Sequence, residues 1–504
     1  MMLFLRLLVL LGFLAGTRAS VAAEFAAAEG RSRELLLASL AFAETHWDES
    51  AGLLWSPAPG ERGQHHRTRE SGWYALGLLA RNEAGDAARA ARIIDRVLAH
   101  QFDAPGQRWD GSFRRAPEEP MPPADAQLWK HYDPNWRQFI GTTFVLMLEK
   151  FEDRLPPELR ERMLAAIRRA VAGELTQGRE EPYHTNIALM QGFLWGWTGA
   201  RLGRGEWVEQ SEAWAERIRA NFARHQTFEE FNSPTYYGVD FYGLALWREL
   251  GATPRVRQLG AEMEAALWRD VAAFYHADLR NLCGPFDRAY GLDLRRYVSL
   301  TGIWMGLVLE REFTPLPDPS GPMGHAHDFL VTPAYVLLGA KVPGDVLPAF
   351  REFQGERRLE RVITSERRAS AWIGRDVMLG GEQTSLTREA GPATRYGQFH
   401  PATAHWRIGE NDVGAFALRV CPPVDARAEP HRLAINTERG EATFRVAAPG
   451  LSADALAREQ WTLPGLHVRV ETDAADFVVT PGEDHVDVTY RAATYFDLRL
   501  EHRP

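Results

Sequence analysis

A helical period from about residue 30 to residue 312 is the feature that most constrains the fold of this chain. Segments 71–82 and 186–202 are apolar on nearly all sides, whereas segments 86–101 and 206–225 carry apolar residues at three- and four-residue steps with charged residues between them. The two kinds alternate along the chain. A helix that is apolar all round has to be buried, and an amphipathic helix can cover it. We therefore predict about ten helices, paired as hairpins in an inner and an outer ring; a long irregular helical array is the alternative.

The period changes in the last third of the chain. A Pro- and Gly-rich break, "FTPLPDPSGPMGH", occupies residues 313–325. Beyond residue 360 apolar and polar residues alternate, as in "LHVRV" at 466–470, which is typical of strands with one buried face. The predicted fold class is α+β and multidomain: an N-terminal (α/α) toroid of helical hairpins over residues 24–350, then an antiparallel β-sandwich over residues 351–504.

The first 23 residues differ from the rest. "MMLFLRLLVLLGFLAG" has one early arginine and then an apolar run, and the small residues of "TRASVAA" follow. This pattern predicts a cleaved signal peptide over residues 1–23, because the run is short for a membrane span. No later segment is apolar for long enough to cross a bilayer. We expect an exported protein, periplasmic or extracellular, with no membrane insertion after cleavage.

The charge balance narrows the class of partner. The formal net charge is −9, which argues against nucleic acid because nucleic-acid binders usually carry a basic face. It leaves room for an acidic ligand held in a local basic pocket. The two cysteines, Cys283 and Cys421, lie far apart in the sequence, and we expect two separate thiols.

Polar residues gather in three segments where predicted inner helices begin. In a toroid these helix starts lie on one rim, so side chains distant in sequence would converge on one cleft. Each has a simpler interpretation: Asn186 and Asp293 could be helix caps, and Tyr236 could be a core aromatic. The segments contribute His184 and Asn186; His225, Glu229, Glu230, Asn232, Tyr236 and Tyr237; and Asp287, Arg288, Tyr290 and Asp293.

Architecture and motif order resemble the polysaccharide lyases that join an α/α toroid to a β-sandwich, the heparinase II/III and alginate lyase-like superfamily. In that group an Asn or His neutralises the uronate carboxylate, a later tyrosine exchanges protons with the sugar, and a β-domain histidine often completes the site. The resemblance implies that His184-Thr-Asn186 is the first element and Tyr237 the second, with Tyr236 as its rival. His225 competes with His184 for the role of base. "GQFHPATAHW" offers His400 and His405 as the third element.

The chemistry of β-elimination suits these residue types. The proton beside a uronate carboxyl is too weakly acidic while the carboxylate stays unpaired, and Asn186 and Arg288 would stabilise the charge that develops. A tyrosine needs a neighbouring cation to become a base. We expect a secreted or periplasmic lyase that cleaves an acidic, uronate-containing polysaccharide without a cofactor. The candidate catalytic residues are Tyr237, Tyr236, His184, Asn186, His225 and Arg288.

Several further residues are candidates for binding the substrate. Sugar rings stack on aromatic faces, and Trp129 and Trp136 lie in the loop-like "QLWKHYDPNWRQ". The candidate substrate-binding residues are Asn232, Glu230, Trp129, His131, Trp136, Tyr290, His400 and His405.

Two other functions remain open. A glycoside hydrolase on the same kind of toroid needs two carboxylates across the scissile bond, and Glu230 with Asp240, or Asp287 with Asp293, could supply them. A non-catalytic carbohydrate-binding protein would need the aromatic residues but not His184, Asn186 or Tyr237.

A possible metal site is the stretch "GHAHD". Alternating histidines can ligate zinc, and His325, His327 and Asp328 are neighbours here. A further ligand is not evident in the sequence, so we expect no metal.

Overall fold

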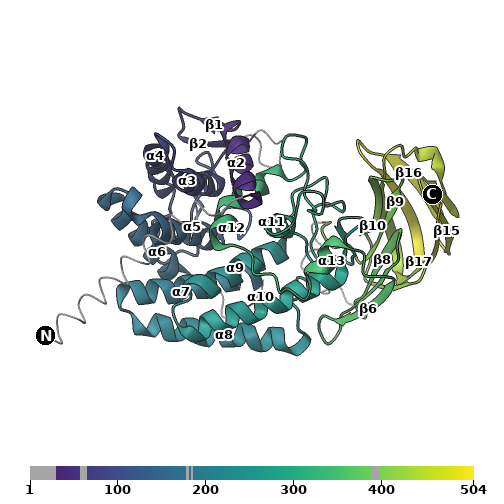
Figure 1. Cartoon of the computed structure of the whole chain (residues 1–504). Coiled ribbons are helices and arrows are strands. Elements are labelled where there is room, and N and C mark those ends of the chain that lie inside the picture. Colours follow the sequence, from purple (N-terminus) through teal and green to yellow (C-terminus); the bar gives the residue numbers. More distant parts are fainter. Residues whose placement is uncertain (1–29, 57–64, 178–180, 183–184, 387–396, 504) are drawn as a thin grey trace.

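The structure is a computed structural model that describes residues 30–56, 65–177, 181–182, 185–386 and 397–503. Helices form the N-terminal part of the molecule and strands the C-terminal part (Figure 1). The predicted signal peptide and His184 lie outside the described residues. Among the helices that are described, none is long and apolar enough to cross a membrane.

The N-terminal domain is built mainly of four helix pairs. The pairs are α3 (Thr68–Arg81) with α4 (Asp86–Leu98), α5 (Trp136–Phe151) with α6 (Pro157–Gln177), α7 (Thr185–Leu202) with α8 (Gly205–His225), and α9 (Tyr236–Leu250) with α10 (Pro254–Phe274). Shorter elements complete the domain: α2 (Arg31–Glu44), α11 (Leu300–Gly306), the 3-10 helix η2 (Ala326–Val331), α12 (Thr332–Leu338) and α13 (Leu347–Arg351). Two small sheets join them, β1 (Trp47–Asp48) to β3 (His65–Arg67) through β2 (Leu53–Ser56), and β4 (Tyr275–His276) with β5 (Asn281–Leu282).

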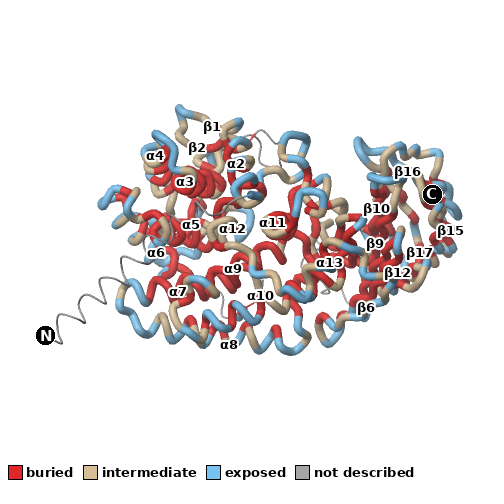
Figure 2. The backbone as a smooth tube through the Cα atoms, viewed as in Figure 1, coloured by how far each residue is buried: buried red, intermediate tan, exposed pale blue. Residues whose placement is uncertain are grey.

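Burial separates an inner from an outer layer of helices. Every residue of α7 from Asn186 to Gly199 is buried, whereas α8 buries only one stripe (Figure 2). The inner helices contact one another in the order α3, α5, α7, α9 and α11, and α12 and α2 close the circle back to α3. The predicted (α/α) toroid is therefore confirmed.

Gly238 sets the position of α9 in the ring. A side-chain methyl at Gly238 would overlap Leu300 at the start of α11, so glycine lets the two helices pack with their backbones close together. The backbone N–H of Thr301 also donates to the carbonyl of Pro234 at 3.0 Å. The start of α9 is thereby held against α11.

The helical period of the sequence reaches residue 312, but the last helix in that stretch, α11 (Leu300–Gly306), is short. α11 begins at Leu300, after Ser299 accepts a hydrogen bond from the backbone N–H of Gly302. The preceding residues are extended instead, because the N–H of Val298 donates to the carbonyl of Gly324 at 2.8 Å. An apolar period cannot reveal such a competing partner.

The C-terminal domain is a twelve-stranded antiparallel sheet that folds on itself. The first half of β12 pairs with β11 and its second half with β10, while β17 pairs first with β16 and then with β15. Both long strands shift register near Gly440, where the sheet passes from one layer to the other. The strands are β6 (Arg357–Val362), β7 (Arg368–Ile373), β8 (Val377–Gln383), β9 (Ala402–Ile408), β10 (Asp412–Val420), β11 (Val424–Glu429), β12 (Arg432–Ala447), β13 (Leu456–Ala457), β14 (Gln460–Leu463), β15 (Leu466–Thr472), β16 (Asp476–Pro481) and β17 (Val486–His502).

The two layers enclose their own apolar core. The Trp461 ring on β14 meets Phe416 on β10 edge to face, with ring centroids 5.5 Å apart, and it meets Phe444 on β12 at the same distance. Contacts between strands that are far apart in the sheet order show that the layers face each other. The predicted β-sandwich is confirmed.

Candidate functional site

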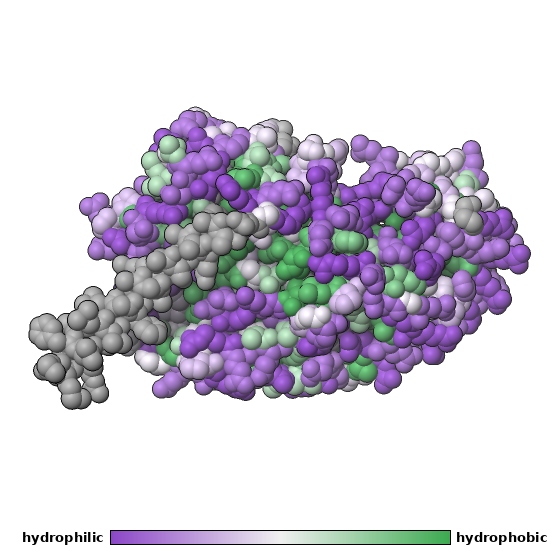
Figure 3. Space-filling view, viewed as in Figure 1, coloured by the Kyte–Doolittle hydropathy of each residue, from purple (hydrophilic) through white to green (hydrophobic). Residues whose placement is uncertain are grey.

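The N-terminal ends of the inner helices lie on one rim of the toroid. Arg69 near the start of α3 places its guanidinium carbon 4.6 Å from the ring of Trp136, the first residue of α5. Asn186 in the first turn of α7 and Tyr236 at the start of α9 are linked to each other through Glu230 and Arg288. Apolar side chains gather in the middle of the face shown in Figure 3, near the place of α11 in Figure 1.

Five of the predicted residues form what we call the rim cluster: Asn186, Glu230, Tyr236, Arg288 and Tyr290. Its centre is the Glu230 carboxylate, which is 2% exposed. The side-chain amide of Asn186 donates to Glu230 Oε2 at 2.5 Å, and Arg288 Nη1 donates to Oε1 at 2.8 Å. An amide and a guanidinium thus converge on one carboxylate, and charge-assisted bonds of this kind are the strong ones.

Two tyrosines extend the rim cluster from Arg288. The Arg288 guanidinium lies 3.7 Å from the ring centroid of Tyr236, and the hydroxyls of Tyr236 and Tyr290 are 2.7 Å apart. Burial holds the pKa of the Tyr236 phenol well above its usual value, the neighbouring Tyr290 raises this pKa further, and the Arg288 charge lowers it. At neutral pH the tyrosine pair therefore holds its protons beside a cation that would stabilise a phenolate.

The structure places Tyr237 away from the rim cluster. Its side chain is 0% exposed, and its hydroxyl contacts Thr227 Oγ1 at 2.8 Å and Asp270 Oδ2 at 3.2 Å. Successive helical residues point about 100° apart, so the neighbour of Tyr236 packs into the wall between α9 and α10. This placement favours Tyr236 over Tyr237 as the tyrosine of the rim.

His225 and Asn232 are also not part of the rim cluster. His225 is the last residue of the outer helix α8, and among the described residues no hydrogen bond or ion pair joins it to the rim cluster. The buried Asn232 has a left-handed backbone (φ 51°), and its amide donates to the carbonyls of Cys283 and Pro285 at 2.7 and 2.9 Å. Asn232 therefore fastens the chain before α9 to a neighbouring loop, and its amide does not face a substrate.

The β-domain histidines support the loop that carries Arg288 and Tyr290. His400 and His405 are 0% exposed, and each has its Nε2 near a backbone carbonyl, that of Ala289 at 3.2 Å and that of Leu292 at 3.0 Å. Burial lowers the pKa of both imidazoles, which favours their neutral forms. They hold the loop in place, and the structure does not show them open to a substrate.

The carboxylates proposed for the alternative hydrolase differ in their bonding partners. Asp287 pairs with Arg367 in the domain junction, and Asp293 pairs with Arg295 at 3.0 Å. Each of these two carboxylates therefore has an arginine partner of its own. Asp240 lies one turn beyond Tyr236 on α9, and neither of its buried oxygens has a hydrogen-bond partner among the described residues. Burial, and then the Glu230 charge, hold the pKa of this carboxyl well above its usual value.

The residues predicted to stack on or contact a sugar differ in how accessible they are. Trp129 is 38% exposed in the loop that leads into α5, and His131 lines a hollow with Arg115, Glu119 and Lys130 beside that loop. Trp136 has its ring face covered by Arg69, so it cannot offer that face to a sugar.

Three residues at or beside the rim were missing from the predicted set. Arg69 and Glu70 lie at the start of the inner helix α3 and form an ion pair, with 2.7 Å between Nη2 and Oε1. Polar residues where inner helices begin were the criterion for the predicted set, and the same criterion would have selected these two. Gln398 lies in the loop before β9, and its Oε1 accepts a hydrogen bond from Arg288 Nε at 3.1 Å. Only the packing of the two domains against each other could reveal this contact. The cysteines Cys283 and Cys421 are free, as expected.

Comparisons with known proteins accompany this geometry. A family model described as a domain of unknown function (DUF8769) matches residues 33–340, and a second one (DUF8770) matches residues 357–490. No curated protein matches the chain. Solved structures similar to it include a heparinase III (TM-score 0.42, 9% identity, 85% of this chain and 76% of that one) and a heparinase III with methylated lysines (0.34, 8%, 86% and 77%). The endoglucanase CelQ from Clostridium thermocellum, complexed with cellobiose and cellotriose, is also similar (0.27, 9%, 94% and 92%).

Proposed function

This chain belongs to the DUF8769 family, and we propose that it is an exported polysaccharide lyase that cleaves a uronate-containing chain by β-elimination in the periplasm or outside the cell. The observation that carries the proposal is the rim cluster. A pair of hydrogen-bonded tyrosines lies against a guanidinium, and the same guanidinium converges with an amide on one carboxylate. Neutralising a carboxylate and moving a proton beside it are the two requirements of elimination from a uronate.

Arg288 is the residue that would hold the substrate carboxylate. Its Nη1 and Nε bond to Glu230 and Gln398, and among the described residues no hydrogen bond or ion pair uses Nη2. Its side chain keeps 19% of its surface exposed. A uronate carboxylate at Nη2 would gain a charge-assisted bond, while Glu230 keeps Arg288 and Asn186 in place.

Tyr236 is the proton-transferring residue in this proposal. As a phenolate stabilised by Arg288, it takes the proton from the carbon beside the uronate carboxyl. The electron pair forms the carbon–carbon double bond, the glycosidic carbon–oxygen bond breaks, and the leaving oxygen receives a proton from the tyrosine pair. Because burial raises the pKa of Tyr236, we expect the elimination rate to rise with pH through the alkaline range.

A glycoside hydrolase is the second candidate, and Asp240 is the observation that favours it. A buried carboxyl with a raised pKa beside a second carboxylate, Glu230, is the arrangement that separates a general acid from a general base. Asp240 is 0% exposed, whereas Tyr236 keeps contact with solvent. This difference in access makes the lyase the better-supported function.

The experiment is to incubate the purified protein with alginate, glucuronan, heparan sulfate, chondroitin and a rhamnose–glucuronate polymer, and to follow near-UV absorbance and reducing ends together. A lyase raises both signals, because each cleavage forms an unsaturated uronate. New reducing ends without absorbance would refute elimination and favour Glu230 and Asp240. If neither signal rises on any polymer, a binding protein is the better description.

A further inference from the structure

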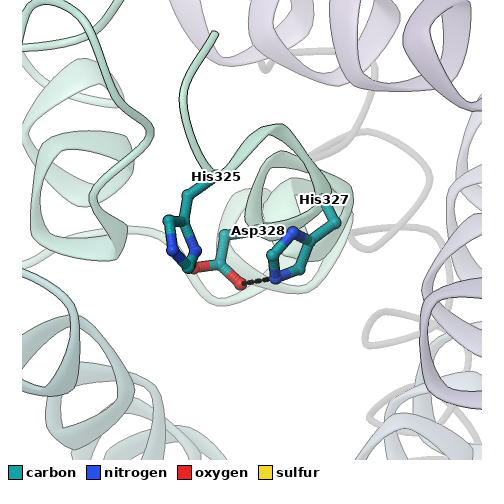
Figure 4. A group of neighbouring side chains, drawn as sticks. All are labelled: His325, His327 and Asp328. Atoms are coloured by element: carbon teal, nitrogen blue, oxygen red, sulfur yellow. Dashed lines mark ion pairs between the residues drawn. The ribbon is translucent and has the colours of Figure 1, made fainter. Parts of the chain in front are cut away.

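His325, His327 and Asp328 form a compact group of metal-ligand side chains at the start of η2. One ligand atom from each lies within 4.8 Å of the others. His325 Nδ1 is 3.8 Å from Asp328 Oδ2, and His327 Nε2 is 3.4 Å from Oδ1. Figure 4 shows the two imidazole rings on either side of the carboxylate. Within the described part of the chain, no other group of three such residues meets this condition.

The backbone and a stacked tyrosine hold His325 in this place. His325 has a left-handed backbone (φ 52°) directly before η2, a conformation that non-glycine residues seldom adopt. Its ring stacks on Tyr290 with centroids 4.1 Å apart and an interplanar angle of 17°. Its Nδ1 atom is buried and has no hydrogen-bond partner among the described residues. The ring is therefore positioned, and one of its nitrogens is available as a ligand.

The local charges favour a cation. Arg69 lies close enough to Glu70 and Asp328 for both to raise the pKa of its guanidinium, and His327 lowers the pKa of Glu70. The carboxylates of Glu70, Asp328 and Asp133 thus act on Arg69, whereas Arg67 is the one further guanidinium that acts on Glu70.

We propose that His325, His327 and Asp328 bind a zinc ion at the edge of the rim cluster. Two imidazoles and one carboxylate are a set that zinc uses where a fourth position stays open for an exchangeable ligand. Zinc bonds of 2.0–2.1 Å put tetrahedral ligand atoms about 3.3 Å apart. The His327–Asp328 pair already has this spacing, and His325 has to move inward through a side-chain rotation. The protein thus supplies three zinc ligands, with Asp328 as the third, and the fourth coordination position of the zinc ion stays open.

The open position would face the tyrosine pair, because Tyr290 lies on His325 and bonds to Tyr236. We assign it to a carboxylate oxygen of the uronate, an assignment that rests on the proposed function. Zinc would then share with Arg288 the task of neutralising the substrate carboxylate. Binding of zinc itself needs no such assumption.

The first measurement is zinc binding by the full, untagged chain after treatment with a chelator, by calorimetric titration and by metal analysis after dialysis. We expect one equivalent per chain, and at least about 100-fold weaker binding by His327→Ala and by Asp328→Asn, since losing even an outer partner of a ligand costs 10–100-fold. His225→Ala is the matched control and should bind as the parent does. His327 is 47% exposed in its side chain, so its replacement should leave folding intact, and thermal unfolding without metal checks this.

The result that overturns the site is a parent protein that takes up no zinc, or His327→Ala and Asp328→Asn that bind as tightly as His225→Ala. Cobalt gives a second readout, because a visible d–d band should appear in the parent and be lost in both variants. Free glucuronate should shift that band if the open position takes a carboxylate, and an unchanged band would refute this assignment alone. Zinc binding without elimination activity would refute the proposed function while the metal site stands.

Discussion

Two arginine–carboxylate clusters lie close together in this molecule, and they differ in how far they are closed. In the junction cluster (Arg367, Asp287 and Glu382), both carboxylates are 0% exposed and the arginine side chain 7%. Arg367 donates to both of them and to the carbonyl of Glu229. In the rim cluster, Arg288 retains exposed surface and a donor group that no described residue uses.

The difference separates a structural from a functional use of the same residue types. Burial, and then the Asp287 charge, hold the pKa of Glu382 well above its usual value. Every partner is internal, and the cluster joins the loop after β5 to the strands of the β domain. The rim cluster has an unused donor beside two phenols, and a ligand could complete it. Breaking each cluster should therefore change a different property.

The largest effect is expected for Tyr236→Phe, which removes the rim hydroxyl and keeps the ring under Arg288. Loss of a positioned acid or base lowers the rate on the order of 10²–10⁴-fold. The measurement is kcat and KM for elimination on the polymer that the substrate panel selects.

Tyr237→Phe is the matched control for that change, because it removes the adjacent hydroxyl from the other side of α9. It should keep nearly full activity and lose about 1–3 kcal/mol of unfolding free energy, since its hydroxyl bonds to Thr227 and Asp270. If Tyr237→Phe loses the activity and Tyr236→Phe keeps it, the assignment of the rim is wrong.

Breaking the junction cluster should chiefly affect stability. Arg367→Met leaves Asp287 and Glu382 buried without their cation, which is expected to cost about 3–5 kcal/mol in unfolding free energy. Urea unfolding followed by circular dichroism measures this. Arg432→Met is the control, because Arg432 is 41% exposed and pairs with Asp497 at the surface, where such pairs contribute about 0–1 kcal/mol. Equal losses in the two variants would contradict the distinction between the clusters.

The sequence was sufficient for the architecture and for the segments of the site, but not for the direction of single side chains. The apolar pattern of residues 186–202 requires burial, and the alternation with outer helices follows from it. Tyr236 and Tyr237 are neighbours of identical chemistry, and only the register of α9 against α11, set at Gly238, decides which one reaches the rim. The neighbours Asp287 and Arg288 likewise belong to different clusters, Asp287 to the junction and Arg288 to the rim. The sequence does not show this, because Arg367, the partner of Asp287, lies far away in the chain.

A smaller and pH-dependent effect distinguishes Asp240 from Asp293. The pKa of Asp240 in the folded state lies above its ordinary value of 3.8, so this carboxyl costs stability as the pH rises above about 4. Asp240→Asn should therefore gain in unfolding free energy relative to the parent as the pH rises, by on the order of 1–3 kcal/mol. Urea unfolding at a series of pH values measures the difference.

For Asp293 we expect the opposite dependence of the free energy of unfolding on pH. Its pKa is lowered, against the effect of burial, by hydrogen bonds and charge from Arg295, so its contribution is present above its unfolded pKa and is lost as the pH falls. Asp293→Asn should cost most at neutral pH and least in acid. The same slope with pH in both variants would show that Asp240 is ionised and paired in solution.

The smallest effect is expected at the edge of the rim, for Trp129→Ala. Trp129 is exposed before α5, and we take the value for a stacked aromatic pair, about 0.5–1.5 kcal/mol, as the scale for a sugar stacked on its indole. KM should rise about 2- to 10-fold while kcat stays unchanged, because a contact made equally in the ground state and the transition state changes KM alone. Leu128→Ala is the control: Leu128 is 47% exposed beside it and offers no ring. An equal change in KM for both variants would mean that the loop contributes apolar surface and not a stacking platform, and the open side of the rim would then lie elsewhere.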